Sequence, residues 1–151
     1  MTEIDLDPVR RLRILAAGVP GAAVTERVVA APFEEVWALV ADFEDGFGRF
    51  EPDMRDVTVS KVDGERVELL ARSRFGMRAR LSGVHRPGWF WAQSRFLLIG
   101  VAAHPEGEGT RVALTGGIRI PGRAALVPFG VRRAARGSLD RLEALLSPGP
   151  R

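Results

Sequence analysis

The sequence of 151 residues contains no cysteine and no tyrosine, and it has only two histidines, His85 and His104. The absence of cysteine excludes disulfide bonds, a thiol nucleophile and thiolate metal ligands. The absence of tyrosine removes the phenolic hydroxyl as a buried acid. No cluster of acidic residues stands near either histidine at a spacing that suits metal ligands. We therefore expect no metal site.

Several motifs of cofactor binding and catalysis are also missing. The segment "GGIRIPG" lacks the lysine and the following helix that a phosphate-binding loop needs. No serine stands in a nucleophile-elbow motif, so a catalytic triad has no support in the sequence. We expect no cofactor.

Long hydrophobic runs are absent, and the chain opens with the acidic segment "MTEIDLD". This start is unlike a signal peptide, and no segment is apolar enough for stable membrane insertion. A cytoplasmic protein is the expectation. Hydrophobic residues make up 46% of the chain and charged residues 27%, as in an ordinary globular domain. At this length the chain fits one domain with a genuine core.

The charges nearly balance, with 22 basic residues against 19 acidic ones and a net charge of +3. Lys61 is the only lysine, so almost all the basic residues are arginines. A surplus this small is weak support for a nucleic-acid partner.

A short amphipathic helix is predicted near the N-terminus, because Asp7 followed by Pro8 is typical of a helix start. Gly18 and Pro20 end the run. The residues that recur at helical spacing are Val9, Leu12, Leu15 and Ala16. This helix is expected to pack on the domain or on a second copy of it, which leaves a homodimer open. A membrane-surface role is the weaker alternative at this length.

The remaining elements follow in order. "AVTERVVAAP" predicts a strand, and a helix with an apolar stripe begins at Pro32. "DFEDGFGRFEPD" predicts a loop with a short helical turn, and the hydrophobic period then changes to two for about six strands. The segment 131–146 predicts a long amphipathic helix in which Arg136 and Asp140 stand one turn apart. The sequence shows no internal repeat and no second domain.

The stretch "ARSRFGMRARLSGVH", residues 71–85, places arginines at every second position. A hairpin about Gly76 would set Arg72 opposite Arg80, and all the arginines would then share one face of the sheet. The preceding hairpin would set Asp56 opposite Arg72. By the same alternation, His85 falls on the other, mostly apolar face. The arginines are therefore expected to form the hydrated side. A lone inward histidine is more often a core residue than a catalyst.

Nucleic-acid binding is a second interpretation of this stretch, because aromatic residues and arginines interleave there as they do in sheets that stack bases. The stacking rings would have to share the arginine face, and alternation places Phe75 on the opposite one. We therefore expect no nucleic-acid partner.

At the level of family, "VTERVVAAPFEEVWALVADFE" resembles the opening of the SRPBCC superfamily, the helix-grip domains related to START lipid-transfer proteins and polyketide cyclases. The likeness extends to "GEGTRVALT" and to the final "LDRLEALL", so it covers residues 23–146. It implies an α+β helix-grip fold with a curved antiparallel sheet of about six to seven strands around the long C-terminal helix. Two short helices would follow the first strand. The implied division is an N-terminal helical extension over 1–22, one helix-grip domain over 23–147 and a tail over 148–151.

The resemblance implies a cavity between sheet and C-terminal helix that binds or carries a small hydrophobic ligand such as a lipid, polyketide or quinone. The alternative is a cyclase, aromatase or dehydratase-like enzyme that uses the same pocket. His85 is then the candidate general acid or base, and Arg95 a candidate anchor for an anionic group. A module that pairs through its N-terminal helix is a third hypothesis, compatible with ligand binding.

Small inward residues, among them Ala71, Ala79, Gly83 and Gly116, either leave room for a ligand or let the helix approach the sheet. Both faces of the strand around Trp91 carry aromatics, so alternation does not assign its inner side. The expected ligand-binding residues are Trp37, Phe50, Leu69, Ala71, Ser73, Met77, Leu81, His85, Trp91, Gln93, Arg95, Leu114 and Phe129.

Overall fold

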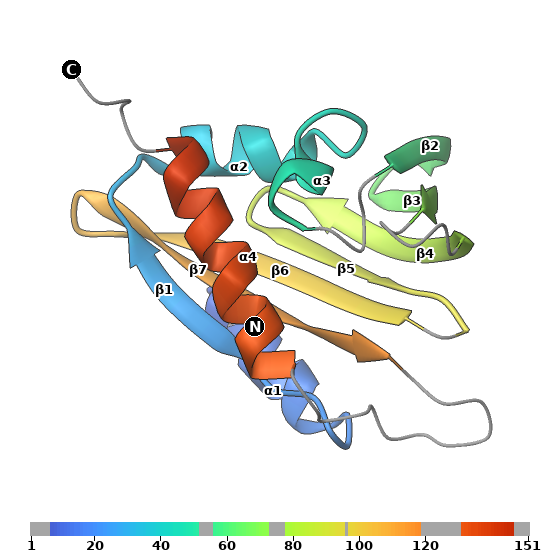
Figure 1. Ribbon diagram of the computed structural model, residues 1–151, viewed down its shortest axis with the longest axis horizontal. Coiled ribbons are helices and arrows are strands. Elements are labelled where there is room, and N and C mark those ends of the chain that lie inside the picture. Colours follow the sequence, from blue (N-terminus) through green and yellow to red (C-terminus); the bar gives the residue numbers. More distant parts are fainter. Residues whose placement is uncertain (1–6, 52–55, 73–77, 96, 119–130, 147–151) are drawn as a thin grey trace, which may run out of the picture.

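A computed structural model describes residues 7–51, 56–72, 78–95, 97–118 and 131–146. Its centre is a seven-stranded antiparallel sheet with strand order β1-β7-β6-β5-β4-β3-β2 (Figure 1). The predicted α+β helix-grip fold is confirmed. In chain order the elements are α1 (Pro8–Ala17), β1 (Thr25–Val29), α2 (Phe33–Ala41), α3 (Phe47–Phe50), β2 (Asp56–Asp63), β3 (Arg66–Arg72), β4 (Arg78–Arg86), β5 (Trp89–Gln93), β6 (Leu97–Glu106), β7 (Gly109–Ile118) and α4 (Val131–Leu146).

Helices cover both faces of the sheet. The inner face is the one that carries α2, α3 and α4, and Figure 1 shows α4 crossing in front of β1 and β7. The outer face carries α1, which packs against β6 and β7. Because strand residues alternate between the two faces, each face buries its own apolar set. The larger cluster lies on the inner face and includes the buried side chains of α2, α3 and α4.

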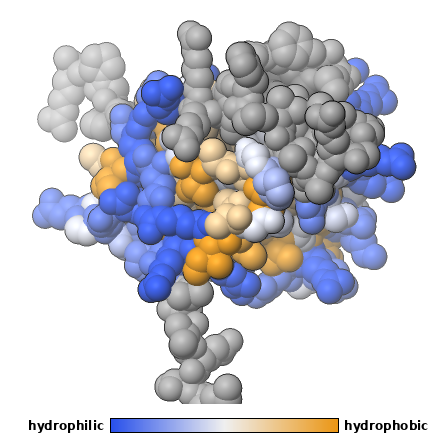
Figure 2. Space-filling view, turned by 90° about the horizontal axis from the view of Figure 1, so that it is seen from below, coloured by the Kyte–Doolittle hydropathy of each residue, from blue (hydrophilic) through white to orange (hydrophobic). Residues whose placement is uncertain are grey.

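Helix α1 begins as the sequence predicts, with the Asp7 carboxylate accepting a hydrogen bond from the Arg10 amide at 2.9 Å. Its buried residues pack on the outer face of the same chain. Leu15, predicted to belong to the apolar stripe, is instead 43% exposed, and its neighbour Ile14 is 54% exposed. Figure 2 shows hydrophobic atoms gathered, with hydrophilic side chains around them, on the side of the molecule where α1 lies. The outer-face cluster consists of Val9, Leu12, Trp89, Ala102 and Ala113.

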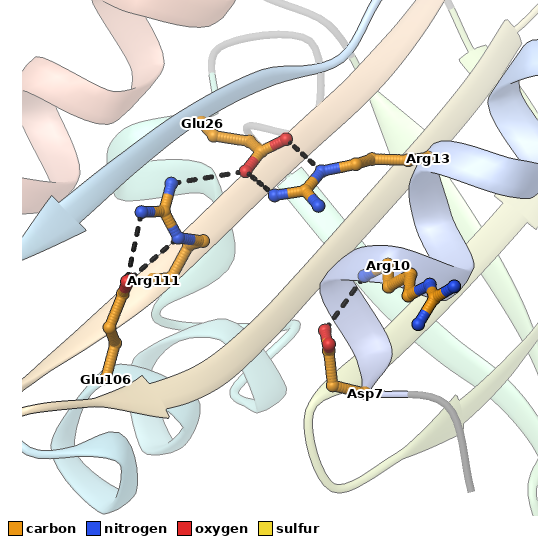
Figure 3. Close-up of polar contacts among 6 residues, drawn as sticks. All are labelled: Asp7, Arg10, Arg13, Glu26, Glu106 and Arg111. Carbon is orange, nitrogen blue, oxygen red and sulfur yellow. Dashed lines mark hydrogen bonds and ion pairs between the residues drawn. The ribbon is translucent and has the colours of Figure 1, made fainter. Parts of the chain in front are cut away.

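An ion-pair network holds α1 to the sheet (Figure 3). The Glu26 carboxylate on β1 accepts hydrogen bonds from Arg13 of α1 and from Arg111 of β7. Arg111 also donates to Glu106 of β6 at 2.7 Å. The hydrogen bond from Arg13 holds the pKa of Glu26 below its usual value. Arg13 and Arg111 on this half of the outer face are therefore paired with carboxylates.

In the hairpin of β3 and β4 each described side chain lies on its predicted face of the sheet, but the residues pair in a different register. Arg72 pairs with Arg78, not with Arg80, and Ala71 pairs with Ala79. The shift is two residues, an even number, so every described side chain stays on its predicted face. Asp56 of β2 lies opposite Arg72 as predicted.

Helix α4 packs its two most buried residues, Leu139 and Leu142, onto the inner cluster. The expected pairing of Asp140 with Arg136 is not the one that forms. Asp140 instead accepts a hydrogen bond from Arg27 of β1 at 2.6 Å, since α4 lies across that strand. Contacts to α3 fix the other side of α4, because Arg141 donates to the Phe50 carbonyl at 2.9 Å.

Candidate functional site

His85 is the polar residue of greatest interest on the inner face. It stands on β4 four residues after Leu81, which is fully buried in the inner cluster, and it pairs with Phe90 of β5. Residues four apart on a strand share a face, so the predicted inward orientation of His85 is confirmed. The side chain as a whole is half-buried.

Two aromatic rings enclose the imidazole. The Trp37 ring stacks on it with the centroids 5.9 Å apart and an interplanar angle of 13°. The Phe43 ring meets it edge-on at 5.0 Å. Trp37 is supplied by α2, where it follows Phe33 by one turn and stacks on that ring as well. The three rings form an apolar wall beside the histidine.

Phe43 is positioned by the turn that ends α2. The Asp42 carbonyl accepts hydrogen bonds from the amides of Gly46 and Phe47, and its side chain accepts one from the Asp45 amide at 3.2 Å. Asp42 itself is exposed at the C-terminal end of α2. The turn therefore presents its aromatic residues, rather than its acids, to the sheet.

The imidazole has an unused hydrogen-bonding atom. Nε2 of His85 is buried and has no hydrogen-bond partner among the described residues. Burial lowers the pKa of His85 below its ordinary value because the charged form is poorly solvated there. A neutral imidazole has one nitrogen that donates and one that accepts. This site therefore suits a neutral polar group, such as a hydroxyl or a carbonyl, better than a charged one.

The structure brings most of the predicted site residues together. Trp37 and Phe50 come from the helices, and the others come from β3, β4 and β7. Six of them are buried in the inner cluster, and the half-buried His85 contacts that cluster through Trp37. The predicted residues in the cluster are Trp37, Phe50, Leu69, Ala71, Leu81 and Leu114.

Three predicted site residues lie elsewhere. On β5 the inner residues are Phe90 and Ala92, so Trp91 points to the outer face, where it stacks on Trp89 at 6.2 Å. Gln93 follows Trp91 on the same side and is exposed, and Arg95 is exposed beyond the strand. The expectation that these three join the inner site is therefore corrected. Ser73, Met77 and Phe129 lie outside the described residues.

Sequence reasoning missed the phenylalanines that complete the inner face. Phe47 contacts the rings of Phe43, Phe50 and Phe90, with centroids 4.9 to 6.1 Å apart. Phe43, Phe47 and Phe50 recur at intervals of four and three in "DFEDGFGRF", which is helical spacing. The segment is so rich in glycine and acidic residues that it was interpreted mainly as a loop, and this spacing was not used. Phe90 was not predicted as an inner residue because aromatic residues on both faces of its strand leave the inner side unassigned.

Two of the small inward residues serve close strand approach. A Cβ atom on Gly83 would lie 2.3 Å from the Trp91 carbonyl oxygen and 2.6 Å from the Ala92 Cβ. A Cβ atom on Gly116 would lie 2.6 Å from the Leu98 carbonyl oxygen. At these positions glycine lets neighbouring strands come together, so neither residue is evidence of space for a ligand.

Within the described ranges, no group of three or more histidine, aspartate or glutamate side chains is placed to hold a metal ion. No helix in the part of the chain that the structure describes is long and apolar enough to cross a membrane.

Comparison with known proteins gives structural but not sequence relatives. The sequence matches no protein-family model and no curated protein. A protein from Chromobacterium violaceum is similar with a TM-score of 0.60 and 18% identity, over 85% of this chain and 98% of that one. A protein from Mesorhizobium loti is similar with a TM-score of 0.63 and 15% identity, over 83% and 96% of the two chains. Ara h 8.0201 has a TM-score of 0.53 and 10% identity, over 83% and 96%. At these identities the similarity establishes the fold alone, and that fold is the helix-grip fold.

Proposed function

We propose that this chain is an SRPBCC-type protein that binds a small, largely hydrophobic and uncharged ligand on the inner face of its sheet. The observation that carries the proposal is the buried, unpartnered Nε2 atom of His85 beside the rings of Trp37 and Phe43. A hydroxyl or carbonyl of the ligand would hydrogen-bond to the imidazole, and its apolar part would lie against the aromatic wall.

The energetic argument begins with the cost of the free nitrogen. A buried polar atom without a partner costs about 1–3 kcal/mol relative to its hydrated state. A core selected for stability alone is expected to place an apolar side chain at position 85. A ligand hydroxyl would remove this cost on binding, and the apolar part of the ligand would add contact with the aromatic rings. In most small-molecule sites a few polar groups give specificity while apolar contact gives most of the affinity.

The lowered pKa of His85 sets the charge of the ligand that the site prefers. An imidazole that stays neutral gives a carboxylate no ion pair, and burial among Trp37, Phe43 and Phe90 adds a desolvation cost for any charge. We propose binding rather than catalysis, because a general base is commonly oriented by a second polar group. Nε2 of His85 has no such partner among the described residues.

The experiment uses a matched pair of probes, 2-naphthol and naphthalene, which differ by one hydroxyl group. Isothermal titration calorimetry measures the affinity of the protein for each. We expect 2-naphthol to bind about 2- to 12-fold more tightly, the range that corresponds to the net value of one hydrogen bond. His85→Leu should reduce this ratio to about one while naphthalene still binds. The exposed His104→Gln is the control and should leave the ratio unchanged.

Equal affinity of the two probes for the unaltered protein, or no binding of either, would mean that His85 is only a core residue. Native mass spectrometry of the purified protein, with organic extraction of any bound molecule, then identifies the natural ligand class. A co-purified charged molecule would contradict the preference for an uncharged ligand.

A further inference from the structure

The outer face has a half that no described helix covers. Helix α1 packs over β6 and β7, whereas the outer side of β3 and β4 is open. This open half carries Leu70, Arg72, Arg78 and Arg80, which we call the arginine surface. All four side chains are exposed, and Leu70 exposes 41% of its area. Leu70 lies directly opposite Arg80, and Arg72 directly opposite Arg78.

The arginines of this surface are not neutralised. None of Arg72, Arg78 and Arg80 makes an ion pair with a described residue. Asp56 lies opposite Arg72 and Glu68 lies two residues before Leu70, yet neither carboxylate reaches ion-pair distance of them. On the other half of the same face, by contrast, Arg13 and Arg111 both bind carboxylates. Within the described ranges, the arginine surface thus carries three arginines that make no ion pair.

The arrangement also opposes like charges. Residues directly opposite each other in an antiparallel pair have Cβ atoms about 4.5–5.5 Å apart, and like charges there destabilise the sheet. Arg72 and Arg78 stand in this relation, and Arg80 follows Arg78 on the same side. An anionic partner would relieve the repulsion. The surface is therefore better matched to a bound anion than to water.

We propose that the arginine surface docks the protein on an anionic lipid bilayer. Arginines near such a surface are attracted to its negative potential, and Leu70, which lies opposite Arg80, supplies an apolar side chain for the interfacial region. Sequence-tolerant binding of single-stranded nucleic acid commonly relies on exposed aromatic rings that stack bases. No aromatic residue is exposed on this surface within the described ranges. In one respect the inference rests on the proposed function, because an uncharged hydrophobic ligand partitions into lipid and would be collected there.

The test measures co-sedimentation of the protein with vesicles of phosphatidylglycerol and phosphatidylcholine, and with vesicles of phosphatidylcholine alone. We expect binding to the anionic vesicles only, weakened by added salt. The double variant R78Q/R80Q should bind about 25-fold more weakly, since each arginine near an anionic surface contributes about five-fold. The matched control R49Q/R136Q removes the same charge from two exposed arginines on the helices of the inner face and should keep most of the binding.

Leu70→Ser tests the apolar contribution and should weaken vesicle binding several-fold with little change in its salt dependence. Absence of binding to the anionic vesicles would overturn the proposal, and so would equal losses in R78Q/R80Q and R49Q/R136Q. Loss of affinity for a DNA oligonucleotide but not for vesicles in R78Q/R80Q would assign the surface to nucleic acid instead. The titration with 2-naphthol contains no vesicles, so failure of the inner site and failure of the arginine surface are separate results.

Discussion

The two faces of the β3–β4 hairpin are built from the same strands yet carry opposite chemistry. On the inner face Leu69 and Leu81 are fully buried, and Nε2 of His85 is a buried polar atom without a partner among the described residues. On the outer face, Arg72 and Arg80 are exposed beside Leu70, which exposes 41% of its area. One unsatisfied atom among rings suits a small molecule with one polar group. Several unpaired charges spread over two strands suit an extended anionic surface.

The outer face repeats the contrast within itself. Where α1 covers it, Trp89 and Trp91 stack under the helix and Arg11 lies over the Trp89 ring at 5.1 Å. Where α1 is absent, Arg72, Arg78 and Arg80 make no ion pair with a described carboxylate. Arginine content alone therefore says little about function, because Arg11, Arg13 and Arg111 beside α1 are already engaged in contacts that hold the fold.

The largest expected effect concerns the inner face. Phe47→Ala removes a fully buried ring that contacts three other phenylalanines, so it should lower the free energy of unfolding by about 3–5 kcal/mol. Urea unfolding followed by circular dichroism measures the change. Leu70→Ala on the outer face is the control, with an expected loss below about 1 kcal/mol. If Phe47→Ala does not fold, Phe47→Leu should still unfold at lower urea than the unaltered protein. Equal losses of unfolding free energy in Phe47→Ala and Leu70→Ala would contradict the expectation that the core lies on the inner face.

The next effect tests the close approach of β4 and β5. Gly83→Ala would bring its Cβ atom to 2.3 Å from a backbone oxygen, so the strands must move apart, at a cost of about 1–3 kcal/mol. Gly18→Ala is the matched control, because there the nearest atom is 3.5 Å away and the backbone is right-handed helical. Urea unfolding of both variants gives the comparison. A Gly83→Ala protein as stable as Gly18→Ala would show that the sheet has room at this position.

Much of this architecture was predictable because the signals are local and periodic. The Asp7–Pro8 start of α1 requires only an N-cap carboxylate and a proline, and alternation along β3 and β4 fixes which side chains are inside. The same alternation placed His85 correctly. Even a register error of two residues left these faces intact, which makes face assignment more robust than pairing.

The rest depended on contacts between segments far apart in the chain. Nothing near Asp140 in the sequence indicates that Arg27 will reach it from β1. Trp91 was predicted as a site residue because aromatic residues on both faces of β5 make alternation uninformative. In the structure it packs, partly buried, against the outer cluster beneath α1. Leu15 misled for the opposite reason. Its helical spacing predicts burial, but only the side of α1 that carries Leu12 packs against the sheet, so Leu15 stays exposed.

A smaller effect is expected from the pH dependence of stability. Because burial lowers the pKa of His85 in the folded protein, the unfolded chain takes up this proton first as the pH falls. The free energy of unfolding should therefore decrease as the pH falls below the ordinary histidine value of about 6.5, and the decrease from this residue ends below its folded pKa. One proton limits the slope to about 1.4 kcal/mol per pH unit.

Urea unfolding at several pH values between 7.5 and 5 measures this slope. His85→Leu should flatten it, whereas the exposed His104→Gln should not. The pKa of Glu26 is also lowered. Its protonation reduces the stability of the fold only at more acidic pH, where its bonds to Arg13 and Arg111 are lost. An unchanged slope in His85→Leu would mean that the imidazole is as well solvated as in the unfolded chain.

The smallest effect is expected on the outer face, and its sign is opposite to that of the first two predictions. Arg78→Glu replaces a like-charge pair with an opposite-charge pair across from Arg72, so it should raise the free energy of unfolding by a few tenths of a kcal/mol. Because both side chains are exposed, 1 M salt should remove most of the gain. The same substitution should weaken binding to anionic vesicles. An arginine whose replacement improves stability and impairs docking is retained for its partner rather than for the fold, whereas a loss of stability would show that Arg78 supports the sheet.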